Sequence, residues 1–408
     1  MADSRICSRC FRLIPTGEQE CQHCAAVDAA SRASRGQLLV LFGALAVVVG
    51  LWLVTDLLAK NFETRRDALG DAWFKQGESD FSAHKLDTAI TDYRNALAYS
   101  RQNFAYRLRL AQALAASGRL RQARAYLLSL WSEQPANSIV NRELAHLSAQ
   151  QGAFEDAVRY YHGAIYGVWP DNAEQQRRDT RFQLVEYLLQ HHQTQAADAE
   201  LIALSGELPR DPAPLTRAAR LLMSAGDFSR AFGLFREAAE IDRRDAGAFA
   251  GAGQAAFRSA DYLNAQHYLQ RAVALSPDDA ASDNLLKIAR TILDLTPYQR
   301  GISSAERSRR VMNAIGLAQA RVRHCLESQS SGLGSLLASG DLQSDGAQLD
   351  SIKASLSPSA LAQDSDLVDS VMDLIGRIEQ DSTKVCGEPQ GADLALMLIA
   401  GKHQGATP

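Results

Sequence analysis

The sequence lacks the short motifs that identify many enzymes. It contains no phosphate-binding loop of the Gly-x-x-x-x-Gly-Lys type, no Gly-x-Ser-x-Gly turn and no His-Glu-x-x-His motif. It also lacks an excess of basic residues. Its 43 Lys and Arg and 47 Asp and Glu give a net charge of -4, whereas nucleic-acid-binding domains are usually basic. These absences predict a protein that is not an enzyme, binds no nucleic acid and takes no small-molecule substrate.

Strand-like sequence is also scarce, because strict alternation of apolar and polar residues is rare along the chain. The longest apolar run has no charged residue from Leu38 to Thr55, and Trp52 suits a headgroup region near its end. About 20 helical residues cross a hydrocarbon core of roughly 30 Å. We therefore predict a transmembrane helix over residues 36–59. A buried core helix and a cleaved signal peptide are the alternatives, although a signal peptide would have to begin behind a cysteine cluster.

Four of the six cysteines lie before residue 25, in two Cys-x-x-Cys pairs. Each pair can place two thiolates about 2.3 Å from one zinc ion, and two pairs complete a tetrahedron with no open position for water. The stretch over about residues 5–26 resembles the small zinc ribbons at the N-termini of many bacterial membrane proteins, which implies one structural Zn²⁺ in a zinc-ribbon domain over residues 1–30. A redox dithiol and unligated cysteines are the alternatives. The expected metal ligands are Cys7, Cys10, Cys21 and Cys24.

Two details of this zinc head depart from the usual ribbon pattern. Phe11 and Ala25 stand where a glycine often follows the second cysteine of each pair, so another residue must adopt the turn geometry. His23 lies between two expected ligands and could replace a cysteine, but we expect it to be a solvated neighbour.

The charges beside the apolar run do not decide its orientation, because Arg32 and Arg35 precede it and Lys60, Arg65 and Arg66 follow it. The cysteines are more informative. A cluster of reduced thiols suits the cytosol, whereas a distant pair of cysteines suits an oxidising compartment. We therefore expect a single-pass protein of the bacterial inner membrane, with its N-terminus in the cytoplasm and its large domain in the periplasm.

A small residue recurs along the middle of the chain at a period of 34 residues, with one step of 40. A bulky residue follows each small one four positions later, so that both lie on one helix face. Prolines end several of the units. The small residues are Ala89, Ala123, Ala157, Ala197, Ala231 and Ala265, and the bulky ones are Tyr93, Leu127, Tyr161, Leu201, Phe235 and Leu269.

This pattern resembles tetratricopeptide repeats (TPRs), whose 34-residue unit is a pair of antiparallel helices. Glycines five residues before three of the alanines, Gly118, Gly152 and Gly226, suit the turn between the two helices. The resemblance implies an all-α fold, a TPR α-solenoid of about six repeats over residues 68–279. A polar insertion, PDNAEQQRRD, accounts for the longer step and predicts a longer loop between the third and fourth repeats.

Arrays of this kind commonly bind a protein or peptide in the groove lined by their inner helices. The resemblance also implies a test for one known mode of binding, a carboxylate clamp of paired lysines and asparagines. Phe74, Glu78, Leu108 and Gln112 occupy the first two such pairs, so that clamp is absent. The expected groove residues are Arg109, Gln112, Arg142, His146, Glu186, Arg217, Arg220 and Gln254.

Residues 280–408 predict a helical C-terminal domain. A capping helix is expected over residues 279–296, a second helix from Ser303 or Ser304 to about residue 326, and a third over residues 364–380. Residues 328–359 are rich in Ser, Gly and Asp and predict only short helical pieces. Outside the cytosol, Cys325 and Cys386 would form a disulfide; buried free thiols are the alternative.

The leading functional hypothesis is a membrane-anchored TPR scaffold that mediates protein–protein interaction in the bacterial cell envelope. An enzyme or enzyme subunit with an unrecognised active site in the C-terminal domain is a second hypothesis. A third makes the zinc head a sensor or docking module coupled to the outer repeats.

Overall fold

The computed structural model describes residues 5–327 and 333–403, without the side chains of residues 31–40, 333–339 and 402–403. The described chain is helical apart from one antiparallel hairpin, β1 (Arg5–Ile6) with β2 (Leu13–Ile14), which confirms the all-α prediction. It divides into two compact units, Met1–Ala157 and Val158–Pro408. The four segments expected from the sequence stay a prediction about which parts fold independently.

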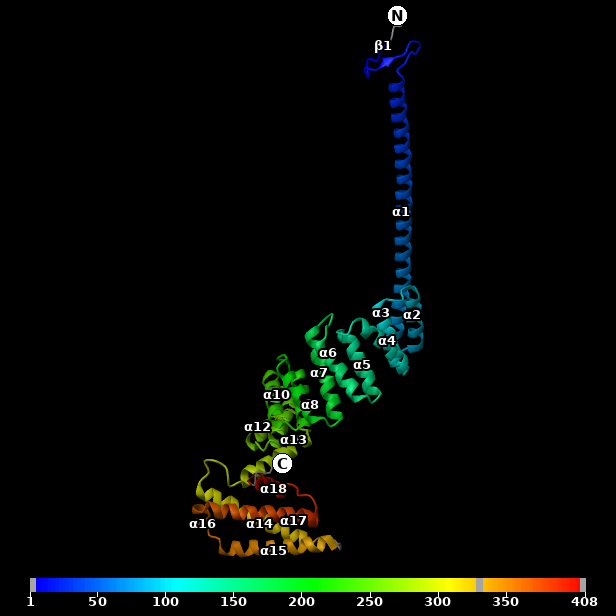
Figure 1. Cartoon of the computed structure of the whole chain (residues 1–408). Helices are drawn as coiled ribbons and strands as arrows, with labels where there is room; N and C mark the ends of the chain where they lie inside the picture. The colour runs from blue at the N-terminus through cyan, green and yellow to red at the C-terminus, as the bar shows by residue number, and fades with distance from the viewer. Residues whose placement is uncertain (1–4, 328–332, 404–408) are drawn as a thin grey trace. The chain divides into compact units, whose positions relative to one another are not determined.

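The first unit begins with the hairpin and continues into α1 (Gln22–Ser82), a helix of 61 residues (Figure 1). The sequence indicated a transmembrane helix and a separate first repeat helix, but no break separates them. The reason lies in the residues between, such as Lys60, Glu63, Arg65 and Arg66, whose straight side chains favour a helix, with no proline or glycine among them before Gly70.

The repeats form antiparallel helix pairs, as the resemblance implied. In the first unit, the end of α1 packs on α2 (Leu86–Tyr99) and α3 (Phe104–Ala116) packs on α4 (Leu120–Glu133). In the second unit, the same pairing joins α7 (Ala173–Gln190) with α8 (Thr194–Ser205), α9 (Pro212–Ala225) with α10 (Phe228–Ile241), and α11 (Ala246–Arg258) with α12 (Tyr262–Leu275). Two further helices are α5 (Ser138–Gln150) and α6 (Phe154–Tyr166).

The periodic residues lie inside these pairs. All six small residues, from Ala89 to Ala265, are completely buried, and all six bulky residues are at most 5% exposed. Removing these alanine and large apolar side chains from water stabilises each pair by roughly 25 cal/mol per Å² of apolar surface. The period found in the sequence is therefore the period of the helix contacts.

The turn inside each repeat contains one residue in the left-handed conformation. Glycine occupies it at Gly118, Gly152 and Gly226, with φ between 70° and 86°. The other three repeats place His84, His192 and Ala260 there, with φ of 59°, 58° and 57°. These six positions share the period of the alanines, although glycine marks only half of them in the sequence.

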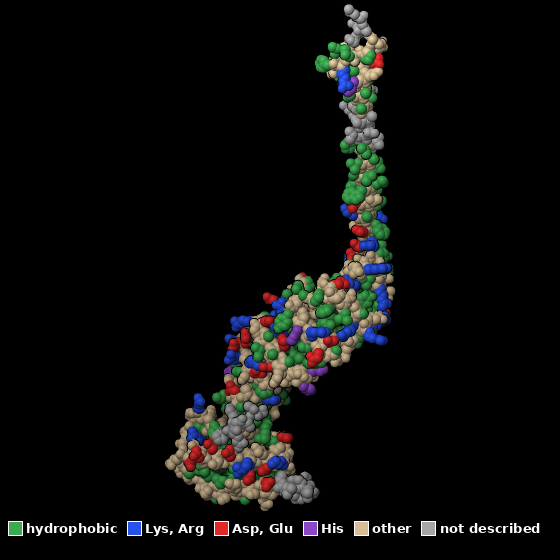
Figure 2. Space-filling model, in the orientation of Figure 1, with side chains coloured by type: hydrophobic (Ala, Val, Ile, Leu, Met, Phe, Trp, Pro, Cys, Tyr) green, Lys and Arg blue, Asp and Glu red, His purple; other side chains and the backbone are tan. Residues whose placement is uncertain are grey.

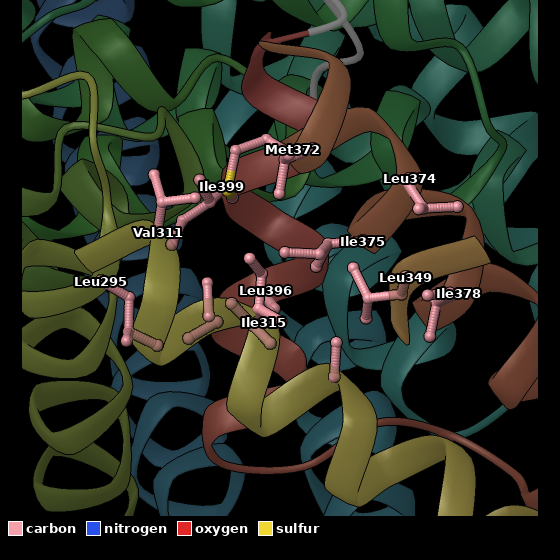
Figure 3. Close-up of a cluster of buried hydrophobic side chains, with 14 of the residues drawn as sticks. Leu295, Val311, Ile315, Leu349, Met372, Leu374, Ile375, Ile378, Leu396 and Ile399 are labelled. Carbon is pink, nitrogen blue, oxygen red and sulfur yellow. The ribbon is translucent and has the colours of Figure 1, made fainter. Parts of the chain in front are cut away.

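The C-terminal part of the second unit is built from α13 (Ala280–Leu295), α14 (Ser304–Glu327), α15 (Leu333–Ser355), α16 (Pro358–Gln363), α17 (Ser365–Cys386) and α18 (Ala392–His403). Ser303 caps α14 by accepting a hydrogen bond from the Glu306 N–H (3.2 Å). Side chains from α13, α14, α15, α17 and α18 share one apolar core, shown in Figure 3 with Ile315, Leu349, Ile375 and Leu396 among those labelled.

Two expectations for this domain are wrong. Residues 333–355 form one helix of 23 residues, not short pieces, because Leu342 and Leu349 are completely buried and α15 packs along α17. Tertiary packing here overrides the weak helix propensity of Ser, Gly and Asp. The third helix also continues beyond residue 380 to Cys386.

Candidate functional site

The four cysteines of the head lie together where the hairpin meets α1. Cys7 follows β1, Cys10 lies in the hairpin turn, Cys21 is at the N-cap of α1 and Cys24 is in its first turn. The Sγ atoms of Cys7 and Cys24 are 3.8 Å apart, those of Cys10 and Cys21 are 3.6 Å apart, and all four lie within 4.8 Å of one another. A tetrahedron with Zn–S bonds of about 2.3 Å has sulfur atoms roughly 3.8 Å apart, so the cluster fits one zinc ion.

The backbone around the cluster favours a thiolate at Cys7, whereas the hydrogen bond with Cys10 and burial raise the pKa of Cys24. Backbone hydrogen bonds from Arg9 and Cys10 lower the pKa of Cys7 to about 6. Phe11 adopts the left-handed conformation (φ 59°) that a glycine would take in a usual ribbon, and its N–H donates to the Cys7 carbonyl (2.9 Å). His23 lies outside the quartet, with Nδ1 3.4 Å from an Arg12 nitrogen. Phe11 therefore adopts the backbone conformation of the missing glycine at a cost in strain. The four sulfur atoms can hold a metal without His23.

The next segment of α1 exposes a continuous apolar surface. From residue 41 onward the helix is long and apolar enough to cross a membrane, with a window of mean hydropathy 2.2 of which none is buried. Figure 2 shows hydrophobic side chains along this segment and charged side chains after it. Exposed Leu, Val, Phe and Trp side chains over this length are unusual for a protein surface in water.

The expected groove residues of the first unit are partly engaged with one another. Arg109 donates to Glu78 (2.9 Å) and to Gln112 (3.0 Å), and Gln112 donates to Glu143 (2.9 Å). Arg109, Gln112 and Glu143 line a cavity of about 320 Å³ together with His146. Contacts between neighbouring repeats therefore satisfy Arg109 and Gln112 inside the protein. Arg142 lies on α5, four residues before His146, and is not among the residues that line this cavity.

In the second unit, two groove arginines on α9 differ in their surroundings. Arg217 donates to Glu186 on α7 (2.7 Å), and its guanidinium lies 4.3 Å from the centre of the Phe182 ring. Arg220, three residues later, lines a cavity of about 480 Å³ together with Gln254 on α11. That Arg142 of the first unit and Arg217 and Arg220 of the second face one concavity stays a prediction.

One residue of this second cavity escaped the sequence analysis. Arg258, the last residue of α11, lines it and stacks over the Phe228 ring, 4.6 Å from the ring centre. Arg258 lies four residues after Gln254 and hence on the same helix face, so the spacing of the inner helix could have identified it.

The C-terminal domain joins Cys325 of α14 to Cys386 at the end of α17 by a disulfide, with the two Cα atoms 5.3 Å apart. This separation lies within the usual range for bonded cysteines. The bridge links sequence positions 61 residues apart across the core of the domain.

Comparisons with known proteins identify the repeats. Residues 80–147 match the family model described as tetratricopeptide repeat, in agreement with the helical solenoid predicted from the 34-residue period. A search among curated proteins found no match.

Several solved TPR structures are similar to the chain. YrrB, described as a TPR protein with an unusual peptide-binding site, is 16% identical, covers 47% of this chain and 95% of its own, and has a TM-score of 0.37. The pilF protein of Pseudomonas aeruginosa is 17% identical over 53% of this chain and 96% of its own, with a TM-score of 0.38. A TPR protein of Cytophaga hutchinsonii is 14% identical over 59% of this chain and 93% of its own, with a TM-score of 0.42.

Proposed function

We propose that this TPR protein is a single-pass membrane scaffold, which recruits a protein partner through its repeats and carries a zinc-bound head at its N-terminus. The observation that carries the proposal is the apolar surface of α1 from residue 41, none of which is buried. The helix continues without a break into the first repeat. A bilayer would cover this surface, and about 20 residues suffice to cross it.

The inner helices support the recruiting role. Their groove side chains line open cavities in both units, and exposed polar side chains beside such cavities suit recognition of a peptide or protein segment. YrrB, by its description, has a peptide-binding site, which illustrates the kind of role proposed here. The role involves no catalytic step.

The two groups of cysteines support an orientation. The head gathers four thiols for a metal ion, which suits a reducing cytoplasm, whereas Cys325 and Cys386 are bonded, which suits an oxidising periplasm. The proposal therefore puts residues 1–35 inside a bacterial cell and everything after Lys60 outside the inner membrane.

Protease treatment of spheroplasts tests the anchor and the orientation together. Protease added outside should digest the repeats and leave a membrane-bound fragment that contains the head. Alkaline carbonate should fail to extract the intact chain, and crosslinking before detergent extraction should recover a partner protein with it. Protection of the repeats from protease would reverse the orientation, and release of the chain by carbonate would remove the membrane anchor from the proposal.

A further inference from the structure

The cavity between α9 and α11 has a floor of unusually small residues. Gly247 of α11 and, three and four positions later, Ala250 and Gly251 line it. The Phe235 ring of α10 packs directly beneath Gly251, where an added Cβ would overlap it. The overlap shows that Gly251 is required by the packing of α10 on α11, and the three lining residues present nothing larger than a methyl group to the cavity.

Two arginines stand at this cavity without acidic partners. Among the described residues, no carboxylate oxygen lies within 4.0 Å of the guanidinium nitrogens of Arg220 or Arg258, and no Asp or Glu lines the cavity. Arg258 is held over the Phe228 ring, which leaves the edge of its guanidinium free to donate. Gln254, four residues before Arg258 on α11, also lines the cavity and offers a side-chain amide.

Nearby arginines show that pairing is available elsewhere in the repeats. Arg217 pairs with Glu186, and Arg230 pairs with Asp198 and Asp227. A solvated arginine on a surface is common and by itself means little. Arg220 and Arg258, on neighbouring inner helices, place two positive charges at one cavity that no Asp or Glu lines.

We propose that this cavity holds a carboxylate of an extended acidic segment in the partner protein, bound between Arg220 and Arg258. The planar guanidinium groups suit bidentate hydrogen bonds to a carboxylate, and such charge-assisted bonds are stronger than neutral ones. The small residues of α11 admit the main chain of the segment, and the Gln254 amide can bond its peptide groups. This inference rests on the recruiting role proposed above and specifies the chemistry of the partner.

Selection of peptides tests the site without knowledge of the natural partner. Random twelve-residue peptides displayed on phage are selected against the full-length chain in detergent. The enriched peptides should carry Asp or Glu, and their binding, followed by fluorescence anisotropy, should weaken as salt concentration rises.

Matched variants assign the effect to the cavity. Arg220→Ala and Arg258→Ala should each weaken binding by roughly 10-fold to 100-fold, the range expected for loss of a charged hydrogen bond. Arg290→Ala removes the same charge from an exposed position on α13 outside the cavity and should leave binding unchanged. Unchanged thermal unfolding would show that the variants fold.

The possible results separate this inference from the role on which it rests. Selected peptides without acidic residues, or acidic peptides that bind Arg220→Ala as tightly as the wild-type chain, would overturn the inference while the recruiting role stands. Failure to select any peptide, together with no crosslinked partner in cells, would overturn both.

Discussion

At the scale of single residues, Glu379 of α17 is a carboxyl group in an apolar core. It is completely buried, and neither of its oxygens has a hydrogen-bond partner among the described residues. Burial is the main cause that raises its pKa from 4.5 to about 8, and the charge of Asp393 on α18 adds to the rise. Arg321 on α14 opposes the shift only in part, because it is also paired with Asp393.

The raised pKa of Glu379 predicts that stability falls with rising pH. Below about pH 4.5 the carboxyl is protonated in both folded and unfolded chains. Between about 4.5 and 8 the unfolded chain releases this proton and the folded chain keeps it, so that unfolding becomes more favourable. Glu379→Gln should therefore raise the free energy of unfolding at pH 8 by on the order of a few kcal/mol, and the thermal unfolding midpoint with it. Near pH 4 the substitution should change stability little.

Glu388→Gln is the matched control for this substitution, since it removes a carboxyl group from an exposed loop position after the same helix. Equal midpoints for Glu379→Gln and the wild-type chain at pH 8 would contradict the assignment of a buried, protonated carboxyl.

The zinc head supplies a second prediction for single residues. The full-length chain, purified under reducing conditions, should contain about one zinc ion, because four thiolates at this spacing form a closed site. Cys10→Ser should lose the metal, whereas a chain with both Cys325→Ser and Cys386→Ser should retain it. Metal content by elemental mass spectrometry decides the question, and a wild-type chain without zinc would exclude the structural metal.

The sequence predicted the head but not Glu379, for a physical reason. Cys-x-x-Cys pairs are a local pattern, so a cluster of four cysteines could be predicted from spacing alone, and the structure brings these four together. The apolar stripe of α17 through Val371, Leu374 and Ile378 predicts one buried face. Glu379 lies beside that stripe and is buried because α15 and α18 both pack on α17. The sequence predicted only short helical pieces in place of α15 and no helix in the position of α18.

At the scale of secondary-structure elements, the turn inside each repeat depends on its left-handed residue. L-amino acids with a side chain adopt this conformation at a cost of roughly 1–2 kcal/mol, which glycine avoids. His84 is exposed at this position, with only a 3.3 Å contact from its ring to the Ser82 carbonyl. Its replacement by glycine should relieve the strain with little loss of contacts.

His84→Gly should therefore raise the stability of the first repeat by up to about 1 kcal/mol, since the added freedom of the unfolded chain offsets part of the gain. Gly118→Ala, at the equivalent turn of the next repeat, should lower stability by a similar amount. Hydrogen exchange of the α1–α2 and α3–α4 amides would measure each change locally. A less stable first repeat in His84→Gly would show that the imidazole contributes more than the strain costs.

Helix boundaries were predictable where residues repeat and unpredictable where they do not. The pattern of an alanine followed four residues later by a bulky residue occurs six times and identifies helix pairs, because each repeat makes the same contacts. Helix α15 exists through long-range packing of Leu342 and Leu349, which no local pattern reveals. Helix α18 is apolar but only 12 residues long, and its contacts with α13 and α17 give it its place.

At the scale of the whole molecule, the sequence predicts an order of segments, since a cysteine cluster, an apolar run and a repeat period leave separate marks in it. The pairing of charges between repeats was not. Arg109 with Glu78 and Arg217 with Glu186 are each 31 residues apart, so only the stacked helices bring them together. These internal pairs remove three expected groove residues, Arg109, Glu186 and Arg217, from the set most available to a partner.

The unbroken course of α1 has a mechanical consequence. With residues 36–59 in a bilayer, as proposed, the first repeat begins where the same helix emerges, and no flexible joint lies between them. Each residue inserted after Lys60 would raise the first repeat by about 1.5 Å and turn it by roughly 100° about the membrane normal. The number of residues in α1 therefore sets the rotation of the first repeat about the helix axis relative to the head. A torque applied to the head would be transmitted through α1 to the first repeat as rotation.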